Sequence, residues 1–418
     1  MEEPEWRSML LEILLNYKKI NWMRRRQFLQ HTTFAASGML MPGFIRQYVS
    51  SKATSRQNKI LVIIQWSGGN DGLNTLIPLG QDPYYQFRPS LALHEEESIL
   101  LQKDLGLHAA LRPLAPDILG GGIHILNQVG YPNPDRSHFR SMDIWQSGSG
   151  SRETWSTGWL GRYLDHQCTS CSPYTALETG DALSLTLKGA DRQGFVMENP
   201  DLLYRTASNP FLRALSRRKG IAEHSDLHYL YQVMQETHLA ADVLHQAIES
   251  HPLTEAFPAT ALGRQLEIIA RLILSDEDIH IFYASLDGFD THANQKQAQA
   301  NLFTQYAEAM QAFMTELKRH QLWSDTLVMT FSEFGRRVAE NASRGTDHGA
   351  ANQVWLAGGN LSGDPLRHAV PDLTRLVDGD LDYRIDFRSI YQELLTGWLH
   401  ADSSAILGES FVPVPLFG

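Results

Sequence analysis

The chain has 418 residues, of which 43% are hydrophobic and 20% are charged. This composition predicts a globular protein whose hydrophobic core is large enough to be stable without disulfides or structural metal ions. The formal net charge is -11, and residues 1–56 carry nine Lys and Arg against four Asp and Glu, so the remainder carries -16. A body this acidic argues against nonspecific nucleic-acid binding. A small anionic substrate stays compatible with it, because a metal ion or a few arginines can reverse the local charge.

Residues 23–30 (MRRRQFLQ) fit the twin-arginine pattern of two arginines, any residue and then Phe-Leu. A modest apolar region, Phe34 to Ile45, follows and is shorter than the roughly 20 apolar residues of a membrane span. We interpret residues 1–56 as a twin-arginine leader preceded by an extension, with Met23 as the expected start of translation. The alternative is a basic amphipathic helix at the domain edge.

The leader predicts that the protein folds in the cytoplasm, crosses the membrane through the twin-arginine translocase and works in the periplasm or outside the cell. The small-x-small signal Ser51-Lys52-Ala53 marks a cleavage site only weakly. Retention of an uncleaved, membrane-anchored N-terminus is therefore left open. No transmembrane span is expected in the mature body, residues 57–418.

Short apolar runs alternate with helical patterns from Asn58 onward, which predicts an α/β fold with a mostly parallel sheet flanked by helices. The expected strands are residues 60–65, 123–127, 279–284, 326–331 and 354–357. Residues 302–317 carry apolar side chains three and four apart, which indicates a helix packed on the core. The segment 165–258 lacks this rhythm and is interpreted as a helical or irregular insertion, with a strand at 183–187 and a helix at 227–248.

Two further features of the sequence have structural explanations that compete with functional ones. Cys168 and Cys171 form a C-x-x-C pair, for which a short disulfide, two free thiols and a redox pair are the alternatives. The tryptophans Trp145, Trp155 and Trp159 would suit a surface polysaccharide, but core packing is the favoured explanation.

Unusual polar residues follow each expected strand, where the chemistry of parallel sheets collects. Asp71 follows the first strand and is equally compatible with a turn. Ser137 stands at an expected helix start, where it is either an N-cap or a nucleophile beside an anion site, and Arg136 and Arg140 flank it. Acids and histidines follow the later strands: Asp290, His292, Glu333 and His348. Oxygen and nitrogen ligands beside a hydroxyl indicate a metal-assisted hydrolase.

Several blocks carry a family resemblance: ILVIIQWSGGNDGLNTLIP, VGYPNPDRSHFRSMDIWQSG, GWLGRYLD, GFDTHANQ, TFSEFGRR and GTDHGAANQVWLAGG. Together they resemble the bacterial domain-of-unknown-function family 1501 from about Ile60 to Leu399. That family is similar in turn to the alkaline phosphatase and sulfatase superfamily. The expected fold is therefore alkaline-phosphatase-like.

The resemblance implies roles for individual residues. Asp71 would be an acidic metal ligand and Ser137 the nucleophile. Asp290, His292 and His348 would form one metal site. Glu333 stands where the superfamily has the acid of an Asp-His pair, whose histidine is replaced by Phe334 here. This loss puts a second metal in doubt and makes an Asp71, Ser137 and Glu333 site better suited to magnesium or calcium than to zinc.

The sequence therefore predicts an exported hydrolase of phosphate or sulfate esters that uses one or two divalent ions (Zn, Mg or Ca). Its substrate would be a small anionic ester or a surface polymer, with Arg136, Arg140 or Arg336 holding the anion. The alternative is a non-catalytic extracytoplasmic binding or assembly protein that keeps the fold with a degraded metal site.

Overall fold

The structure is a computed structural model that describes residues 59–168, 171–216 and 225–418. The predicted leader and its extension, which include Met23 and the twin arginines, lie outside these residues. Within the described part, no helix combines the length and the apolar character needed to cross a membrane.

The described residues form a central sheet of eight strands. In spatial order these are β15 (Ile385–Asp386), β5 (Ile123–Gly130), β12 (Asn352–Gly358), β9 (Thr326–Phe331), β1 (Ile60–Ser67), β8 (Ile281–Asp287), β6 (Ala176–Glu178) and β7 (Phe195–Val196). All pairings are parallel except those of β12, which runs antiparallel to both β5 and β9. The predicted mostly parallel sheet flanked by helices is therefore confirmed.

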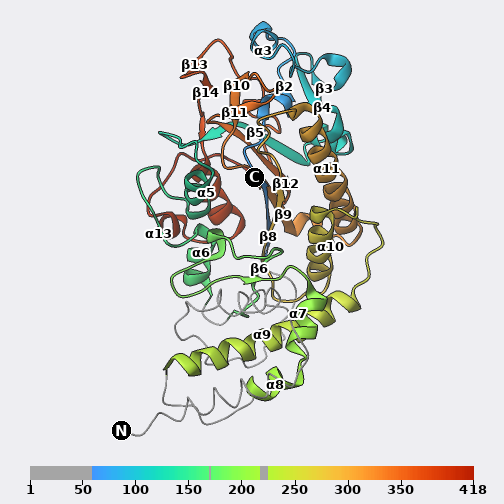
Figure 1. Cartoon of the computed structure of the whole chain (residues 1–418), viewed down its shortest axis with the longest axis vertical. Helices are drawn as coiled ribbons and strands as arrows, with labels where there is room; N and C mark the ends of the chain where they lie inside the picture. Colours follow the sequence, from blue (N-terminus) through green and yellow to red (C-terminus); the bar gives the residue numbers. More distant parts are fainter. Residues whose placement is uncertain (1–58, 169–170, 217–224) are drawn as a thin grey trace. The chain divides into compact units, whose positions relative to one another are not determined.

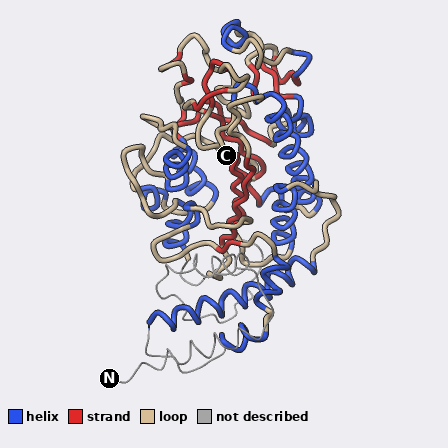
Figure 2. Tube along the Cα trace, viewed as in Figure 1, coloured by secondary structure: helices blue, strands red, loops and turns tan. Residues whose placement is uncertain are grey.

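Helices cover both faces of this sheet (Figures 1 and 2). One face packs on η3 (Ala109–Leu114), α4 (Ala115–Leu119), α10 (Ala261–Leu274) and α11 (Gln295–Arg319). The other packs on α5 (His138–Ser147), α6 (Trp159–Gln167), α12 (Phe387–Glu393), η6 (Leu394–Trp398) and α13 (Ser403–Leu407). Because side chains alternate across a strand, β1 sends Val62 and Ile64 into the first layer and Leu61 and Ile63 into the second.

Smaller elements surround the sheet. Three antiparallel groups are formed by β2 (Leu76–Ile77), β4 (Leu105–His108) and β3 (Ser98–Gln102), by β10 (Arg336–Glu340) and β11 (Thr346–His348), and by β13 (Leu376–Val377) and β14 (Asp380–Leu381). The remaining helices are η1 (Gly72–Asn74), α3 (Asp82–Phe87), η2 (Glu95–Glu97), η4 (Leu185–Leu187), α7 (Pro200–Ala207), α8 (Pro210–Ser216), α9 (Ser225–Ser250) and η5 (Trp323–Asp325).

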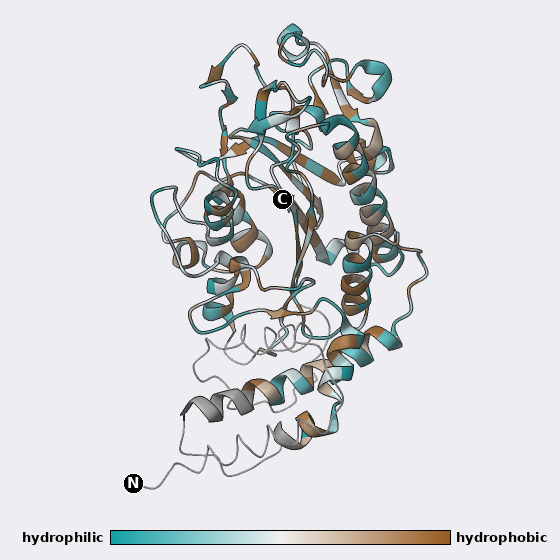
Figure 3. Ribbon diagram, viewed as in Figure 1, coloured by the Kyte–Doolittle hydropathy of each residue, from teal (hydrophilic) through white to brown (hydrophobic). Residues whose placement is uncertain are grey.

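The apolar stripe predicted at 302–317 lies on α11, where Phe303, Met310 and Leu317 are buried in the core. Figure 3 shows hydrophobic residues along the strands and on the flanking helices. The prediction of a strand at residues 183–187 is wrong, because residues 185–187 form the short helix η4. The segment 165–258 does contain helices, but it also adds β6 and β7 to the edge of the central sheet.

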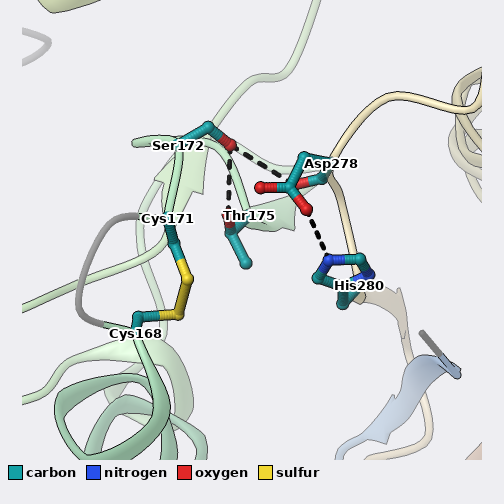
Figure 4. Close-up of a disulfide and its surroundings, with 6 residues drawn as sticks. All are labelled: Cys168, Cys171, Ser172, Thr175, Asp278 and His280. Carbon is teal, nitrogen blue, oxygen red and sulfur yellow. Dashed lines mark hydrogen bonds and ion pairs between the residues drawn. A yellow bond between two sulfur atoms is a disulfide. The ribbon is translucent and has the colours of Figure 1, made fainter. Parts of the chain in front are cut away.

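The disulfide explanation for the cysteines and the core-packing explanation for two of the three tryptophans agree with the structure, whereas Trp155 is only partly buried and lies beneath the guanidinium of Arg162. Cys168 and Cys171 form a disulfide just after α6, beside a hydrogen-bonded group that includes Ser172, Thr175 and Asp278 (Figure 4). Trp145 and Trp159 are 2% and 1% exposed and stack on aromatic rings in the core. These two tryptophans are therefore core residues, as favoured from the sequence.

Candidate metal centre

Several polar side chains lie close together beyond the carboxyl ends of the parallel strands of the central sheet. Because β5, β8 and β9 run in the same direction, the residues that follow them gather there. His138 is the first residue of α5, after β5, whereas Asp290 and His292 lie between β8 and α11. Glu333 follows β9, and His348 ends β11.

Three imidazoles converge on one carboxylate oxygen. The Oδ1 atom of Asp290 lies 3.0 Å from Nε2 of His292, 3.1 Å from Nε2 of His348 and 3.4 Å from Nε2 of His138. The Nε2 atoms of His292 and His348 are themselves 2.9 Å apart. Ligand atoms of His138, Asp290 and His348 all lie close enough to bind one ion.

The other ring nitrogen of each histidine contacts an acceptor. Nδ1 of His138 lies 2.9 Å from Oε1 of Glu333, and Nδ1 of His348 lies 2.8 Å from the carbonyl oxygen of Arg136. Nδ1 of His292 lies 3.3 Å from Oδ1 of Asp347. An Nδ1–H that donates to such an acceptor leaves a bare lone pair on Nε2, which is the arrangement of metal-binding histidines.

The donor atoms of these side chains are arranged so that they could coordinate a metal ion. Bare Nε2 atoms that face one another and a carboxylate repel unless a cation lies among them. In addition, Nε2 of His138 is shielded from solvent and has no hydrogen-bond partner among the described residues. Nitrogen and carboxylate donors in this number suit zinc better than magnesium or calcium.

The charged groups around the centre favour an ionised Asp290. Partial burial raises the pKa of Asp290, but the hydrogen bond from Arg336 and the neighbouring imidazoles outweigh it and hold that pKa at about 2. The hydrogen bond to Glu333 raises the pKa of His138 above its usual value. Glu333 is buried, and its carboxylate also accepts the N–H of Gly68 at 2.9 Å. In this geometry Glu333, predicted as a metal ligand, instead orients His138.

Asp71 does not join this cluster. Its carboxylate is 1% exposed and forms a two-pronged ion pair with the fully buried Arg88, with distances of 2.6 and 3.0 Å. It also accepts the N–H of Leu73 at the start of η1 and a hydrogen bond from Gln295. The physical reason is that a buried guanidinium needs an anion, so Asp71 compensates Arg88 where the sequence predicted a metal ligand.

The predicted nucleophile Ser137 is exposed, whereas the two arginines beside it are bound to other parts of the protein. Ser137 lies at the N-cap of α5, and its hydroxyl forms no capping hydrogen bond with the helix. The backbone N–H of Ser137 donates to Asp135 at 2.7 Å. Arg136 pairs with the buried Asp380. Arg140 donates to backbone carbonyls of residues 150–153. The hydroxyl therefore stays available, whereas Arg140 is engaged in holding a loop.

His138 was missed from the sequence, although it directly follows the serine that was singled out. Its signal was indirect: an imidazole expected after Glu333 is replaced by Phe334, and a histidine elsewhere could supply it. The Phe334 ring packs against the rings of His138 and His348, at centroid distances of 4.8 and 4.7 Å. This aromatic ring fills space beside the centre.

Residues 124–368 match the family described as "Protein of unknown function (DUF1501)", and this match spans more than half of the chain. The chain belongs to this family. All of the candidate metal ligands of this DUF1501 protein, Asp290 and the three histidines, lie inside the matched region. The predicted membership is confirmed.

Comparison with curated proteins finds no match. Among solved structures, the fold is similar to a protein in the alkaline phosphatase superfamily from Vibrio parahaemolyticus, with 12% identity, a TM-score of 0.35 and coverage of 94% of this chain and 80% of the other. The C-terminal periplasmic domain of EcEptC from Escherichia coli, in complex with Zn, gives 8% identity, a TM-score of 0.31 and coverage of 78% of each chain. The lipooligosaccharide phosphoethanolamine transferase A of Neisseria meningitidis gives 10% identity, a TM-score of 0.36 and coverage of 85% of this chain and 58% of the other. Likenesses of this size are too slight to assign an activity.

Proposed function

We propose that this protein is an exported, metal-dependent hydrolase of phosphate or sulfate esters with one divalent ion, preferably zinc. The observation that carries the proposal is the convergence of three Nε2 atoms on Asp290, with each Nδ1 contacting an acceptor. His138, His292, His348 and Asp290 would hold the ion. Such an ion would supply Lewis-acid polarisation of the ester oxygen and stabilise a deprotonated hydroxyl.

Ser137 is the proposed nucleophile. Its exposed hydroxyl adjoins His138 in the chain and stands at the N-terminus of α5, where free N–H groups favour an anion. Its Oγ would form a bond to phosphorus or sulfur while the ester oxygen leaves as the alcohol, which takes up the proton that the serine loses. Water would then release the free anion and restore the hydroxyl.

The proposed location rests on the leader. Residues 23–30 fit the twin-arginine pattern, and a chain that folds before crossing the membrane can load its metal in the cytoplasm. Replacing Arg25 and Arg26 by lysine should keep the protein in the cytoplasmic fraction. Unchanged recovery of this variant from the periplasm would refute export by this route.

The alternative, a non-catalytic binding or assembly protein, is favoured by one observation. Phe334 packs on two candidate ligands at the position where the superfamily resemblance implies a histidine. The two functions share the metal centre and differ in turnover. A protein that binds zinc but cleaves no ester would support this alternative.

The experiment that tests the proposal combines metal analysis with turnover. Purified protein should contain about one ion per chain, lose it to a chelator and regain thermal stability on addition of zinc. The loaded protein should cleave 4-nitrophenyl phosphate or 4-nitrophenyl sulfate. His138→Ala should abolish metal retention, whereas His320→Ala, which removes a half-exposed histidine paired with Glu316, should not. Absence of bound metal, together with unchanged melting when Zn, Mg or Ca is added, would refute the proposal.

A further inference from the structure

Arg336 lies at the base of the candidate metal centre and is shielded from solvent. Its side chain is 0% exposed, and Nη2 lies 2.7 Å from Oδ1 of Asp290, the oxygen on which the three imidazoles converge. A guanidinium in this position cannot reach a substrate in solvent. The expectation that Arg336 holds the substrate anion is therefore replaced by a different role.

The same guanidinium ties together the loops that carry the centre. It donates to the carbonyls of Gly68 and Gly69 after β1, to that of Phe289 after β8 at 3.0 Å and to that of Thr346 in β11 at 2.8 Å. Arg336 itself begins β10, shortly after β9. One side chain thus connects the β10–β11 hairpin with two loops that lie far from it in the sequence, those after β1 and β8.

Glycine is needed where two of these segments approach. Gly68 and Gly69 have φ angles of +118° and +78°, and a Cβ atom on Gly68 would lie 2.3 Å from the backbone nitrogen of Asp290. Their carbonyls can therefore point at Arg336 while the first loop packs directly on the second. The backbone carbonyls of both loops therefore surround the guanidinium of Arg336 and accept its hydrogen bonds.

We propose that Arg336 is a positioning residue that forms the metal centre before the ion arrives, by fixing Asp290 and the loops after β1 and β8. The inference rests on the proposed metal centre. Without Arg336, metal binding would have to order these loops itself, which lowers affinity. Residues that hydrogen-bond to metal ligands act in the same way, and their loss costs about 10- to 100-fold in metal affinity.

A buried arginine of the same kind elsewhere in the fold provides a matched control. Arg88 is also 0% exposed, pairs with Asp71 and donates to the carbonyls of Arg337 and Val338 at 2.9 and 2.8 Å. It contacts none of the candidate metal ligands. A purely structural effect of losing a buried arginine should therefore be the same for Arg88 and Arg336, whereas an effect on the metal centre should be confined to Arg336.

The test compares Arg336→Lys and Arg88→Lys with the wild-type protein. Zinc affinity would be measured by competition with a chromophoric chelator, and the absorption spectrum of the cobalt-loaded protein would report the coordination geometry. We expect Arg336→Lys to lose about 10- to 100-fold in zinc affinity and to show an altered cobalt spectrum. Arg88→Lys should bind zinc within about threefold of wild type, since it leaves the ligands untouched.

Hydrogen exchange of the metal-free wild-type protein provides a second measurement that needs no variant. The N–H groups of Gly68, Asn70 and Phe289 have acceptors in the loops that Arg336 joins, and they should be protected before zinc is added. Free exchange of these groups until zinc binds would overturn the inference, as would equal zinc affinities for the two lysine variants. If the wild-type protein binds no zinc, the proposed metal centre itself is refuted.

Discussion

Replacement of Asp71 by alanine separates the two roles of this residue, metal ligand and counter-ion of Arg88. Both groups are buried, with exposures of 1% and 0%, and two hydrogen-bonded contacts of 2.6 and 3.0 Å join them. Removing one partner of such a pair leaves an uncompensated buried charge, which costs about 3–5 kcal/mol. We therefore expect Asp71→Ala to lower the free energy of unfolding by about that amount and to leave zinc affinity unchanged.

Urea unfolding followed by tryptophan fluorescence, with and without zinc, measures the first quantity, and chelator competition measures the second. The double variant Asp71→Ala/Arg88→Met should recover part of the lost stability, because it removes the unpaired charge as well. A free energy of unfolding of Asp71→Ala within about 1 kcal/mol of the wild-type value would show that Asp71 is not a required counter-ion of Arg88. Loss of zinc by a variant that stays folded would show that Asp71 is a metal ligand after all.

Three further predictions concern other parts of the molecule. Ser137→Ala should keep its metal and lose ester hydrolysis by about 1000-fold or more, and full activity would remove Ser137 as the nucleophile. Burial raises the pKa of Glu178 to about 7, above its usual 4.5, so its contribution to stability is complete below pH 4.5 and is lost as the pH rises past 7. Between pH 5 and 8 the wild-type protein should therefore lose about 2–3 kcal/mol more than Glu178→Gln in urea unfolding, and parallel pH profiles would contradict this. Replacing Cys168 and Cys171 by serine opens a loop of four residues and should cost about 2 kcal/mol, so an abolished fold would show a larger role for the disulfide.

The sheet could be predicted where its strands are long and buried on both faces. β1 and β9 appear in the sequence as uninterrupted apolar runs that no helix pattern matches. The antiparallel direction of β12 could not be predicted, because an apolar run does not encode the direction of a strand. β6 and β7 are three and two residues long and leave almost no pattern, so the segment that contains them was interpreted as an insertion.

Part of the candidate metal centre could be located from the sequence for a similar reason. Asp290 and His292 follow one recognisable strand and His348 shortly precedes another, and the rule that chemistry collects at strand ends selects such residues. The partner of Asp71 could not be found in this way, because Arg88 follows α3 in a segment with no motif. The burial of Arg336 depends on the loops after β1 and β8, which meet the β10–β11 hairpin only in the fold.

The charges around the centre favour one divalent ion over two. Asp290, Glu333 and Asp347 contribute three negative charges when ionised, and the guanidinium of Arg336 contributes one positive charge. The sum of these formal charges is -2, which one divalent cation neutralises. A second divalent cation would leave an excess of +2 in a partly buried site, and the carboxylate of Asp71 is already neutralised by Arg88. The Phe334 ring, packed on His138 and His348, offers no ligand to such an ion. The charge balance and the packing therefore both favour a mononuclear centre, in which the divalent ion would supply two positive charges and Arg336 supplies the third.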